Sequence, residues 1–255
     1  LRVGASRPIY CLQTHLGDVQ AYAAVAEHVP RALTLLGLRY GGGARTLKQR
    51  YPDLQALARL FVARIVAHDP RGPYSLLGYS WGGLLAYEVS RQLIADGRRV
   101  AFLGLVGTEQ QALPMERTLS RLRRARVPRE LVAMIRRRGA RWLGVGRRDA
   151  ISRADSDVTP HTRLGDLHFE LGAKYRTRSG GPQVIHLIRE RELPAHYDPY
   201  GLSPEERWRL WTGADVRVYW TTGTHDTCMT PAHAQQTARR IVDAVRDAIP
   251  GTEDL

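Results

Sequence analysis

The chain has 255 residues, of which 43% are hydrophobic and 25% are charged, with a mean hydropathy of −0.34. These values are those of a soluble protein with one large α/β domain or two small ones, and no apolar run approaches the roughly 20 residues of a membrane helix. Two cysteines, Cys11 and Cys228, are too few for a disulfide framework and favour a reduced, cytoplasmic setting. The chain begins at Leu1 without an initiator Met or the apolar segment of a signal peptide, so we expect a domain cut from a longer protein.

The net charge of +13 comes almost entirely from arginine, and many arginines lie between residues 121 and 148. A basic segment of this kind can bind nucleic acid, anionic lipid or an acidic protein. A solvated helix face explains the same run. Because no interleaved aromatic residues or nucleic-acid motif accompany it, we expect no nucleic-acid partner.

Apolar runs alternate with helical patterns along the first half of the chain, which predicts a mostly parallel sheet with helices on both faces. Strands are expected at 7–12, 33–38, 73–77 and 100–106, and helices at 19–29, 51–68 and 84–94. An Arg-rich stretch from about 110 to 178 then reads as several short helices. The strand pattern resumes at 182–188 and 215–220, before a final helix at 231–249. We therefore predict a single domain with a core of 1–109 and 182–255 and a helical lid inserted at 110–178.

A G-x-S-x-G motif, Gly78-Tyr79-Ser80-Trp81-Gly82, lies between a predicted strand and a predicted helix. Strand, tight turn and helix are the parts of a nucleophile elbow, which exposes a serine hydroxyl at the helix N-terminus. Glycines are needed because the strained serine backbone presses its neighbours against the next strand and helix. The motif predicts Ser80 as a catalytic nucleophile, and the alternative is an ordinary Gly-rich turn.

A serine hydroxyl needs a base to take its proton, and in α/β-hydrolases that base is a histidine after the last strand. His225 directly follows the predicted strand 215–220, so we expect it to be the base. An oxyanion formed on an ester or thioester needs backbone N–H donors. We expect these from the amide of Trp81, which should also shape the acyl pocket, and from the loop after the first strand, at His15.

Three segments carry a specific resemblance: Pro8-Ile9-Tyr10-Cys11-Leu12-Gln13-Thr14-His15-Leu16-Gly17, the stretch 72–88 around Ser80 with its Gly-Pro-Tyr lead-in, and Gly223-Thr224-His225. Together they resemble the C-terminal (type I) thioesterase domains of non-ribosomal peptide synthetases and modular polyketide synthases. The resemblance implies an α/β-hydrolase fold with a helical lid. It also implies transfer of an acyl chain from the phosphopantetheine thiol of an acyl or peptidyl carrier domain to Ser80. Release would follow by hydrolysis or macrocyclisation, without a metal or bound cofactor.

The sequence departs from this family at the triad acid and at the first loop. The family places an aspartate where this chain has Gly107. Either the acid has moved to the turn after the penultimate strand, where Glu192 ranks before Glu190 and Asp198, or Glu109 reaches back, or the acid is absent through divergence or an introduced substitution. We favour Glu192, although surface pairing with neighbouring arginines explains these glutamates almost as well. In the first loop, Gln13-Thr14 replaces the family's usual His-Pro, which leaves the oxyanion geometry open.

Two other functions fit the same residues. A stand-alone editing (type II) thioesterase clears stalled acyl groups from carriers. A catalytically weakened hydrolase fold could serve only to dock a carrier. In each case the Arg-rich lid offers a basic face to an acidic carrier domain.

Overall fold

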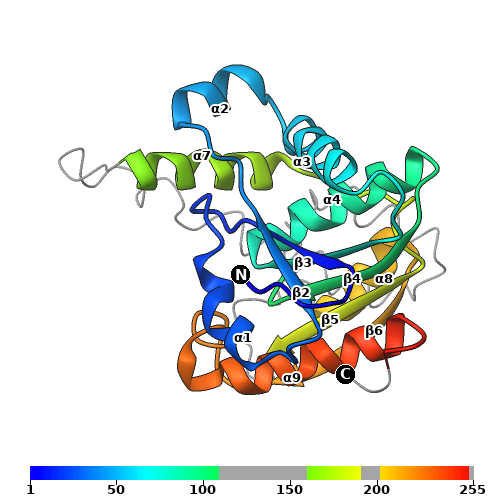
Figure 1. Cartoon of the computed structure of the whole chain (residues 1–255). Helices are drawn as coiled ribbons and strands as arrows, with labels where there is room; N and C mark the ends of the chain where they lie inside the picture. The colour runs from blue at the N-terminus through cyan, green and yellow to red at the C-terminus, as the bar shows by residue number, and fades with distance from the viewer. Residues whose placement is uncertain (109–159, 191–201, 253–255) are drawn as a thin grey trace, which may run out of the picture.

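The computed structural model describes residues 1–108, 160–190 and 202–252 (Figure 1). Within these ranges six strands form one sheet in the order β2-β1-β3-β4-β5-β6, and every neighbouring pair is parallel. The strands are β1 (Pro8–Leu12), β2 (Thr34–Leu38), β3 (Tyr74–Tyr79), β4 (Val100–Val106), β5 (Val184–Glu190) and β6 (Asp215–Thr221). The predicted parallel α/β sheet is confirmed.

Helices cover both faces of the sheet. Figure 1 shows α1 and α9 on one face, and α3, α4 and α7 on the other. The helices are η1 (Gln20–Tyr22), α1 (Ala23–His28), α2 (Ala44–Arg50), α3 (Leu54–His68), α4 (Trp81–Ala95), α7 (Pro160–Lys174), α8 (Pro204–Thr212) and α9 (Pro231–Ala248).

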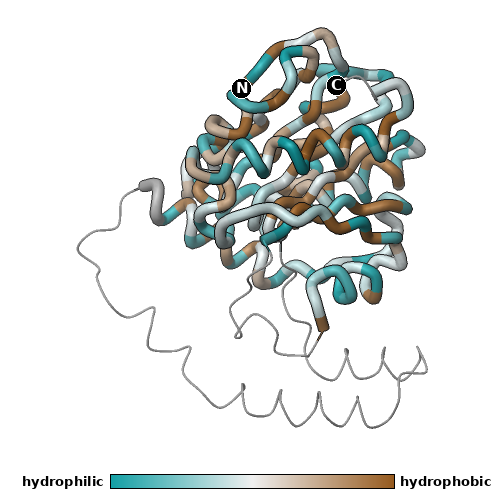
Figure 2. Tube along the Cα trace, turned by 90° about the horizontal axis from the view of Figure 1, so that it is seen from below, coloured by the Kyte–Doolittle hydropathy of each residue, from teal (hydrophilic) through white to brown (hydrophobic). Residues whose placement is uncertain are grey.

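The sheet separates two hydrophobic cores, because successive strand side chains point to opposite faces. In β1, Tyr10 and Leu12 join the core under α3 and α4, while Ile9 and Cys11 join the core under α1 and α9. Burial on both faces explains why the strands read as continuous apolar runs. The helices, by contrast, alternate hydrophilic and hydrophobic residues, as Figure 2 shows for the face seen from below.

Some elements differ from the sequence prediction. β3 continues to Tyr79 and α4 begins at Trp81, so the turn between them is the single residue Ser80. The helices α2 and α8 were not predicted. The start of α8 is marked in the sequence by a capping box, in which Ser203 and Glu206 bond each other's backbone amides. Pro204 lies at the first helical position.

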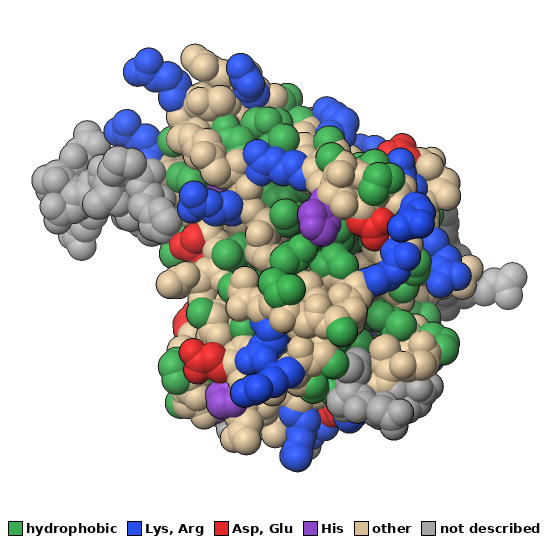
Figure 3. All heavy atoms as spheres, in the orientation of Figure 1, with side chains coloured by type: hydrophobic (Ala, Val, Ile, Leu, Met, Phe, Trp, Pro, Cys, Tyr) green, Lys and Arg blue, Asp and Glu red, His purple; other side chains and the backbone are tan. Residues whose placement is uncertain are grey.

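The predicted lid falls mainly outside the described residues. Its described part contains α7, a helix of 15 residues, and the other short helices predicted for this stretch fall outside the described residues. The arginines between 121 and 148 lie outside the described residues. On the face in Figure 3, the Lys and Arg side chains that are described are spread over many elements and do not form one patch. No helix in the described ranges is long and apolar enough to cross a membrane.

Candidate active site

The turn between β3 and α4 forces Ser80 into an unusual backbone conformation. Its φ is 54° and its ψ is −125°, and it is the only non-glycine residue with positive φ in the described ranges. The strain is held by close packing: a Cβ at Gly78 would lie 2.5 Å from the carbonyl oxygen of Gly82, and one at Gly83 would overlap the Thr108 side chain. The glycines of the motif are therefore needed for the elbow to close.

His225 lies in the loop between β6 and α9, and the structure brings it to Ser80. The Ser80 Oγ and His225 Nε2 atoms are 3.0 Å apart, a hydrogen-bond distance. This contact joins residues 145 positions apart in the sequence. The pair has the geometry of a nucleophile and its general base.

Tyr79, the residue before the nucleophile, contacts the same histidine. Its hydroxyl donates to the His225 carbonyl oxygen at 2.6 Å, and its ring stacks on the imidazole with centroids 5.6 Å apart. Burial raises the pKa of the Tyr79 hydroxyl well above its ordinary value, so it remains a donor at every physiological pH. Sequence reasoning missed this residue, because nothing local to the motif shows that the strand end reaches His225.

The other imidazole nitrogen faces Glu190, the last residue of β5. The His225 Nδ1 and Glu190 Oε1 atoms are 3.8 Å apart, and the Glu190 side chain is only 3% exposed. Its second oxygen, Oε2, is buried without a hydrogen-bond partner among the described residues. Glu192, Asp198 and Glu109, the other acids considered, lie outside the described residues.

Gly107 lies beside this contact and explains why an acid on β5 can reach it. A Cβ built on Gly107 would lie 3.0 Å from His225 Nδ1 and 3.7 Å from Glu190 Oε2. The glycine amide donates to the Ile188 carbonyl oxygen at 2.9 Å, which joins the carboxyl ends of β4 and β5. The family's usual acid position and Glu190 therefore converge on the same nitrogen from neighbouring strands.

The two expected oxyanion donors come from the start of α4 and from the loop after β1. Trp81 is the first residue of α4, so its amide has no partner within the helix. The loop after β1 is held by its own bonds: the Thr14 amide donates to the Asp18 carbonyl oxygen at 2.8 Å, and the Gly17 amide donates to the Thr14 carbonyl oxygen at 3.0 Å. These bonds fix the backbone on both sides of His15.

Tyr22 ties this loop to the elbow. Its hydroxyl donates to the Leu12 carbonyl oxygen at 2.8 Å and accepts from the Tyr79 amide at 2.8 Å. Complete burial raises the pKa of Tyr22 well above its ordinary value. The carboxyl ends of β1 and β3, which precede the loop around His15 and Ser80, are therefore joined through one buried phenol.

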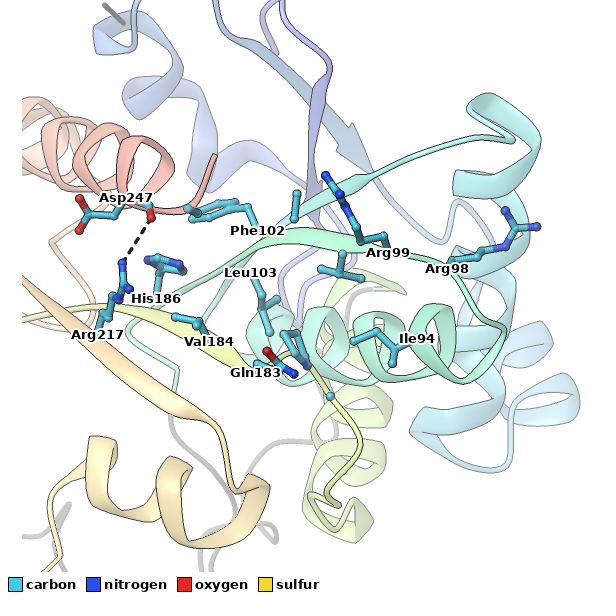
Figure 4. Close-up of a pocket in the computed structure, with 15 residues that line it drawn as sticks. Ile94, Arg98, Arg99, Phe102, Leu103, Gln183, Val184, His186, Arg217 and Asp247 are labelled. Atoms are coloured by element: carbon cyan, nitrogen blue, oxygen red, sulfur yellow. Dashed lines mark hydrogen bonds between the residues drawn. The ribbon is translucent and has the colours of Figure 1, made fainter. Parts of the chain in front are cut away.

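A pocket of about 530 Å³ opens at the opposite end of the sheet (Figure 4). It forms because β4 and β5 pair only from Gly104 and His186 onward, which leaves their amino-terminal halves apart. Burial lowers the pKa of His186 to about 4, so it is neutral at pH 7, and in Figure 4 the Arg98 side chain extends away from it. None of the residues that form the Ser80 site lines this pocket, and we do not assign the active site to it.

A parallel sheet with a strained serine elbow and a histidine after its last strand defines the α/β-hydrolase class. The family model of the thioesterase domain matches residues 7–245, so the chain belongs to the thioesterase domain family. The resemblance seen in the sequence is thereby confirmed. The part of the chain that the structure describes holds no group of three or more metal-ligating side chains.

Curated relatives and solved structures agree with this family. The chain is 25% identical over 222 residues to enterobactin synthase component F of Escherichia coli, covering 86% of this chain and 16% of that protein. It is 33% identical over 102 residues to the nonribosomal peptide synthetase atrA of Aspergillus terreus, covering 40% of this chain and 11% of that one. The matched stretch therefore spans about a sixth or less of these proteins.

Two solved structures cover nearly the whole chain. A covalent complex of the NocB thioesterase domain with a fluorophosphonate nocardicin G analog has a TM-score of 0.63 and 25% identity, with 97% of this chain and 96% of that one covered. The thioesterase domain SrfTE, described for the cyclization of the lipopeptide antibiotic surfactin, has a TM-score of 0.58 and 16% identity, with 93% and 90% covered. The second likeness is one of fold alone.

Proposed function

We propose that this chain is a chain-releasing serine thioesterase that takes a peptide or polyketide chain from the phosphopantetheine thiol of a carrier domain. Release proceeds through an acyl-Ser80 intermediate, to water or to an amine or hydroxyl of the chain itself, which closes a ring. The observation that carries the proposal is the 3.0 Å contact between Ser80 Oγ and His225 Nε2 at a strained elbow, in a member of the thioesterase family.

In acylation, Ser80 Oγ attacks the thioester carbonyl carbon while His225 Nε2 takes the hydroxyl proton. The carbonyl oxygen becomes an oxyanion, which accepts hydrogen bonds from the amides of Trp81 and His15. Collapse of this intermediate breaks the C–S bond, and His225 returns the proton to the leaving sulfur. Ser80 then carries the acyl chain as an ester.

Deacylation uses the same groups. His225 takes a proton from water, or from the internal amine or hydroxyl, as that group attacks the ester carbonyl. The second oxyanion forms against the same two amides. Its collapse breaks the bond to Ser80 Oγ, which recovers its proton from His225. Each step uses this chain's own residues and the thioester on the carrier.

We assign the triad acid to Glu190 in place of Glu192. When His225 takes the serine proton, its imidazolium faces a buried carboxylate, and the attraction is stronger there than in water. The 3.8 Å separation exceeds a hydrogen-bond length, so in this arrangement Glu190 stabilises the imidazolium through charge.

The relatives support a carrier-borne substrate. Two of them are named as a synthase component and a nonribosomal peptide synthetase, which favours chain release over stand-alone editing. The NocB thioesterase domain forms a covalent complex with a fluorophosphonate, which supports using such a probe on Ser80. The partner that we propose is a carrier domain.

The test is hydrolysis of an acyl-N-acetylcysteamine thioester, together with fluorophosphonate labelling located by mass spectrometry of the digested protein. We expect turnover and one adduct, on Ser80. Turnover with no adduct on Ser80 would overturn the nucleophile. No turnover and no adduct would leave the carrier-docking function in its place. A preference for acetyl-loaded over peptidyl-loaded carrier would favour editing.

A further inference from the structure

His168 on α7 is buried, and the proposed mechanism does not use it. Its side chain is fully shielded from solvent although it comes from the lid helix and not from the sheet. Both of its ring nitrogens make hydrogen bonds to the loop that follows β1. Because both of its ring nitrogens bond the same loop, His168 helps to hold that loop in place.

The bonding pattern fixes which nitrogen carries the proton. The Gln13 side-chain oxygen accepts from the Tyr40 amide, so its NH₂ group points to His168 and donates to Nε2 at 3.0 Å. Nδ1 therefore carries the hydrogen and donates to the His15 carbonyl oxygen at 2.6 Å. Burial lowers the pKa of His168 to about 4, which keeps the ring in this neutral form near pH 7.

The same ring also contacts the second oxyanion segment. The His168 imidazole and the Trp81 indole are tilted by 41° with centroids 4.7 Å apart. Trp81 supplies one expected oxyanion amide, and the loop around His15 supplies the other. From α7, His168 therefore contacts both segments.

α7 is held to α4 independently of His168. The Tyr175 hydroxyl, just beyond the helix, donates to Glu88 Oε2 at 2.9 Å, and the Tyr87 hydroxyl donates to the Arg178 carbonyl oxygen at 2.5 Å. Leu171 is buried against the same core. Loss of the His168 hydrogen bonds therefore leaves the end of α7 docked, so the effect of a substitution is local to the loop.

We propose that His168 is a positioning residue: by bonding Gln13 and the His15 carbonyl while packing on Trp81, it aims the two oxyanion amides and couples the lid helix to catalysis. The inference rests on the proposed function. Because the peptide that contains the His15 carbonyl belongs to the loop that supplies the expected amide, tilting that loop moves the donor away from the oxyanion. The effect falls on the transition state and not on substrate binding.

Two substitutions of His168 test its hydrogen-bond donor, Nδ1, and its acceptor, Nε2, separately. The Asn amide nitrogen matches the place of Nδ1, so His168→Asn keeps the bond to the His15 carbonyl, whereas His168→Gln keeps only a partner for Gln13. With the N-acetylcysteamine thioester, we expect His168→Gln to lower kcat roughly 10- to 100-fold, below the full loss of an oxyanion donor. We expect KM to change little, and His168→Asn to recover most of the rate. An alkyl boronic acid, whose tetrahedral oxygen occupies the oxyanion hole, should bind more weakly in proportion to kcat.

The acidic limb of the kcat/KM profile should stay where it is in His168→Gln, because the Ser80–His225 pair is intact. Leu171→Ala, a buried change on the same helix, should lower Tm without this selective loss of kcat, and the exposed Glu170→Gln should change neither. Equal rates for wild type and both His168 variants would overturn the inference, as would equal losses in both that track Tm. A wild type with no turnover and no Ser80 adduct would instead overturn the proposed function.

Discussion

The two nitrogens of His225 meet very different surroundings. Nε2 lies 3.0 Å from Ser80 Oγ, whereas Nδ1 lies 3.8 Å from Glu190 Oε1. The serine side is held by the strained elbow, by Tyr79 and by close glycine packing. On the acid side, the ends of two strands approach Nδ1 at a longer distance. The Ser80–His225 contact therefore has one fixed geometry, whereas the ends of two neighbouring strands lie beside Nδ1.

Substitution of Ser80 or of His225 should have the largest effect on kcat. We expect Ser80→Ala and His225→Ala each to lower kcat by roughly 10⁴- to 10⁶-fold, because either change removes the proton transfer that activates the nucleophile. The rate of thioester hydrolysis measures this loss of kcat. Ser90→Ala is the matched control, since that buried serine of α4 donates to a carbonyl oxygen of its own helix, at Tyr87. Ser80→Ala with more than a tenth of the wild-type rate would contradict the assignment.

Glu190→Gln tests the acid side. We expect kcat to fall roughly 10²- to 10⁴-fold, because the imidazolium loses the charge that stabilises it. Glu206→Gln is the control, because it keeps the capping box of α8. Normal turnover in Glu190→Gln together with a loss in Glu192→Gln would return the acid to Glu192.

Gly107→Asp in the Glu190→Gln background asks whether the two acid positions are equivalent. Aspartate tolerates the positive φ of 51° at this residue, and its Cβ would already lie 3.0 Å from His225 Nδ1. We expect kcat to recover about tenfold over Glu190→Gln, since a carboxylate again faces the imidazole and the tight Cβ contact limits the gain. Gly107→Ala in the same background adds the Cβ without the charge. Equal rates for the Asp and Ala variants would show that the positions are not interchangeable.

Tyr79→Phe removes one hydrogen bond from the serine side. We expect kcat to fall about 5- to 10-fold, the equivalent of one net hydrogen bond, because the His225 backbone loses its donor while the ring stacking remains. Tyr219→Phe removes a hydroxyl that donates to Asp247 at 2.6 Å, and it should leave kcat unchanged. Identical losses in the two variants would point to a general loss of packing.

The last prediction concerns stability and not the rate. Burial lowers the pKa of His168 and of His186 to about 4, from an ordinary value of 6.5. Below pH 6.5 these two histidines bind protons in the unfolded chain but not in the folded chain. The free energy of unfolding therefore falls as the pH is lowered from 6.5 to about 4. Each histidine contributes a slope of up to about 1.4 kcal/mol per pH unit in that window. The free energy of unfolding, measured with urea at pH 7, 6 and 5, should depend less steeply on pH in His186→Gln than in wild type. The exposed His28→Gln should show the wild-type dependence.

The elbow at Ser80 and the proposed base, His225, have local signals that can be found in the sequence. Ser80 lies between an apolar run and a helical pattern, and His225 follows the last strand. The expected acid, Glu192, was counted from a strand thought to end at Ile188, whereas β5 continues to Glu190. Among the described residues the glutamate beside His225 is Glu190, at 3.8 Å, and Glu192 lies outside them.

The role of His168 could not be read from sequence. It pairs with Gln13 across 155 residues, and the helical pattern of α7 does not show which part of the fold its apolar side faces. The sequence shows Gln13-Thr14 in place of His-Pro, but it does not show the partner of Gln13 on α7. Contacts of this range depend on how the insertion packs over the sheet, which local periodicity does not contain.

The convergence of Gly107 and Glu190 on one imidazole nitrogen has a consequence for mutational paths. An acid can change strands in two single substitutions, with a carboxylate beside the base at every stage. The intermediate with both acids would hold two carboxylates close together, and their mutual repulsion raises the pKa of one of them. Such a chain retains one negative charge at Nδ1, so neither step has to pass through an enzyme without an acid.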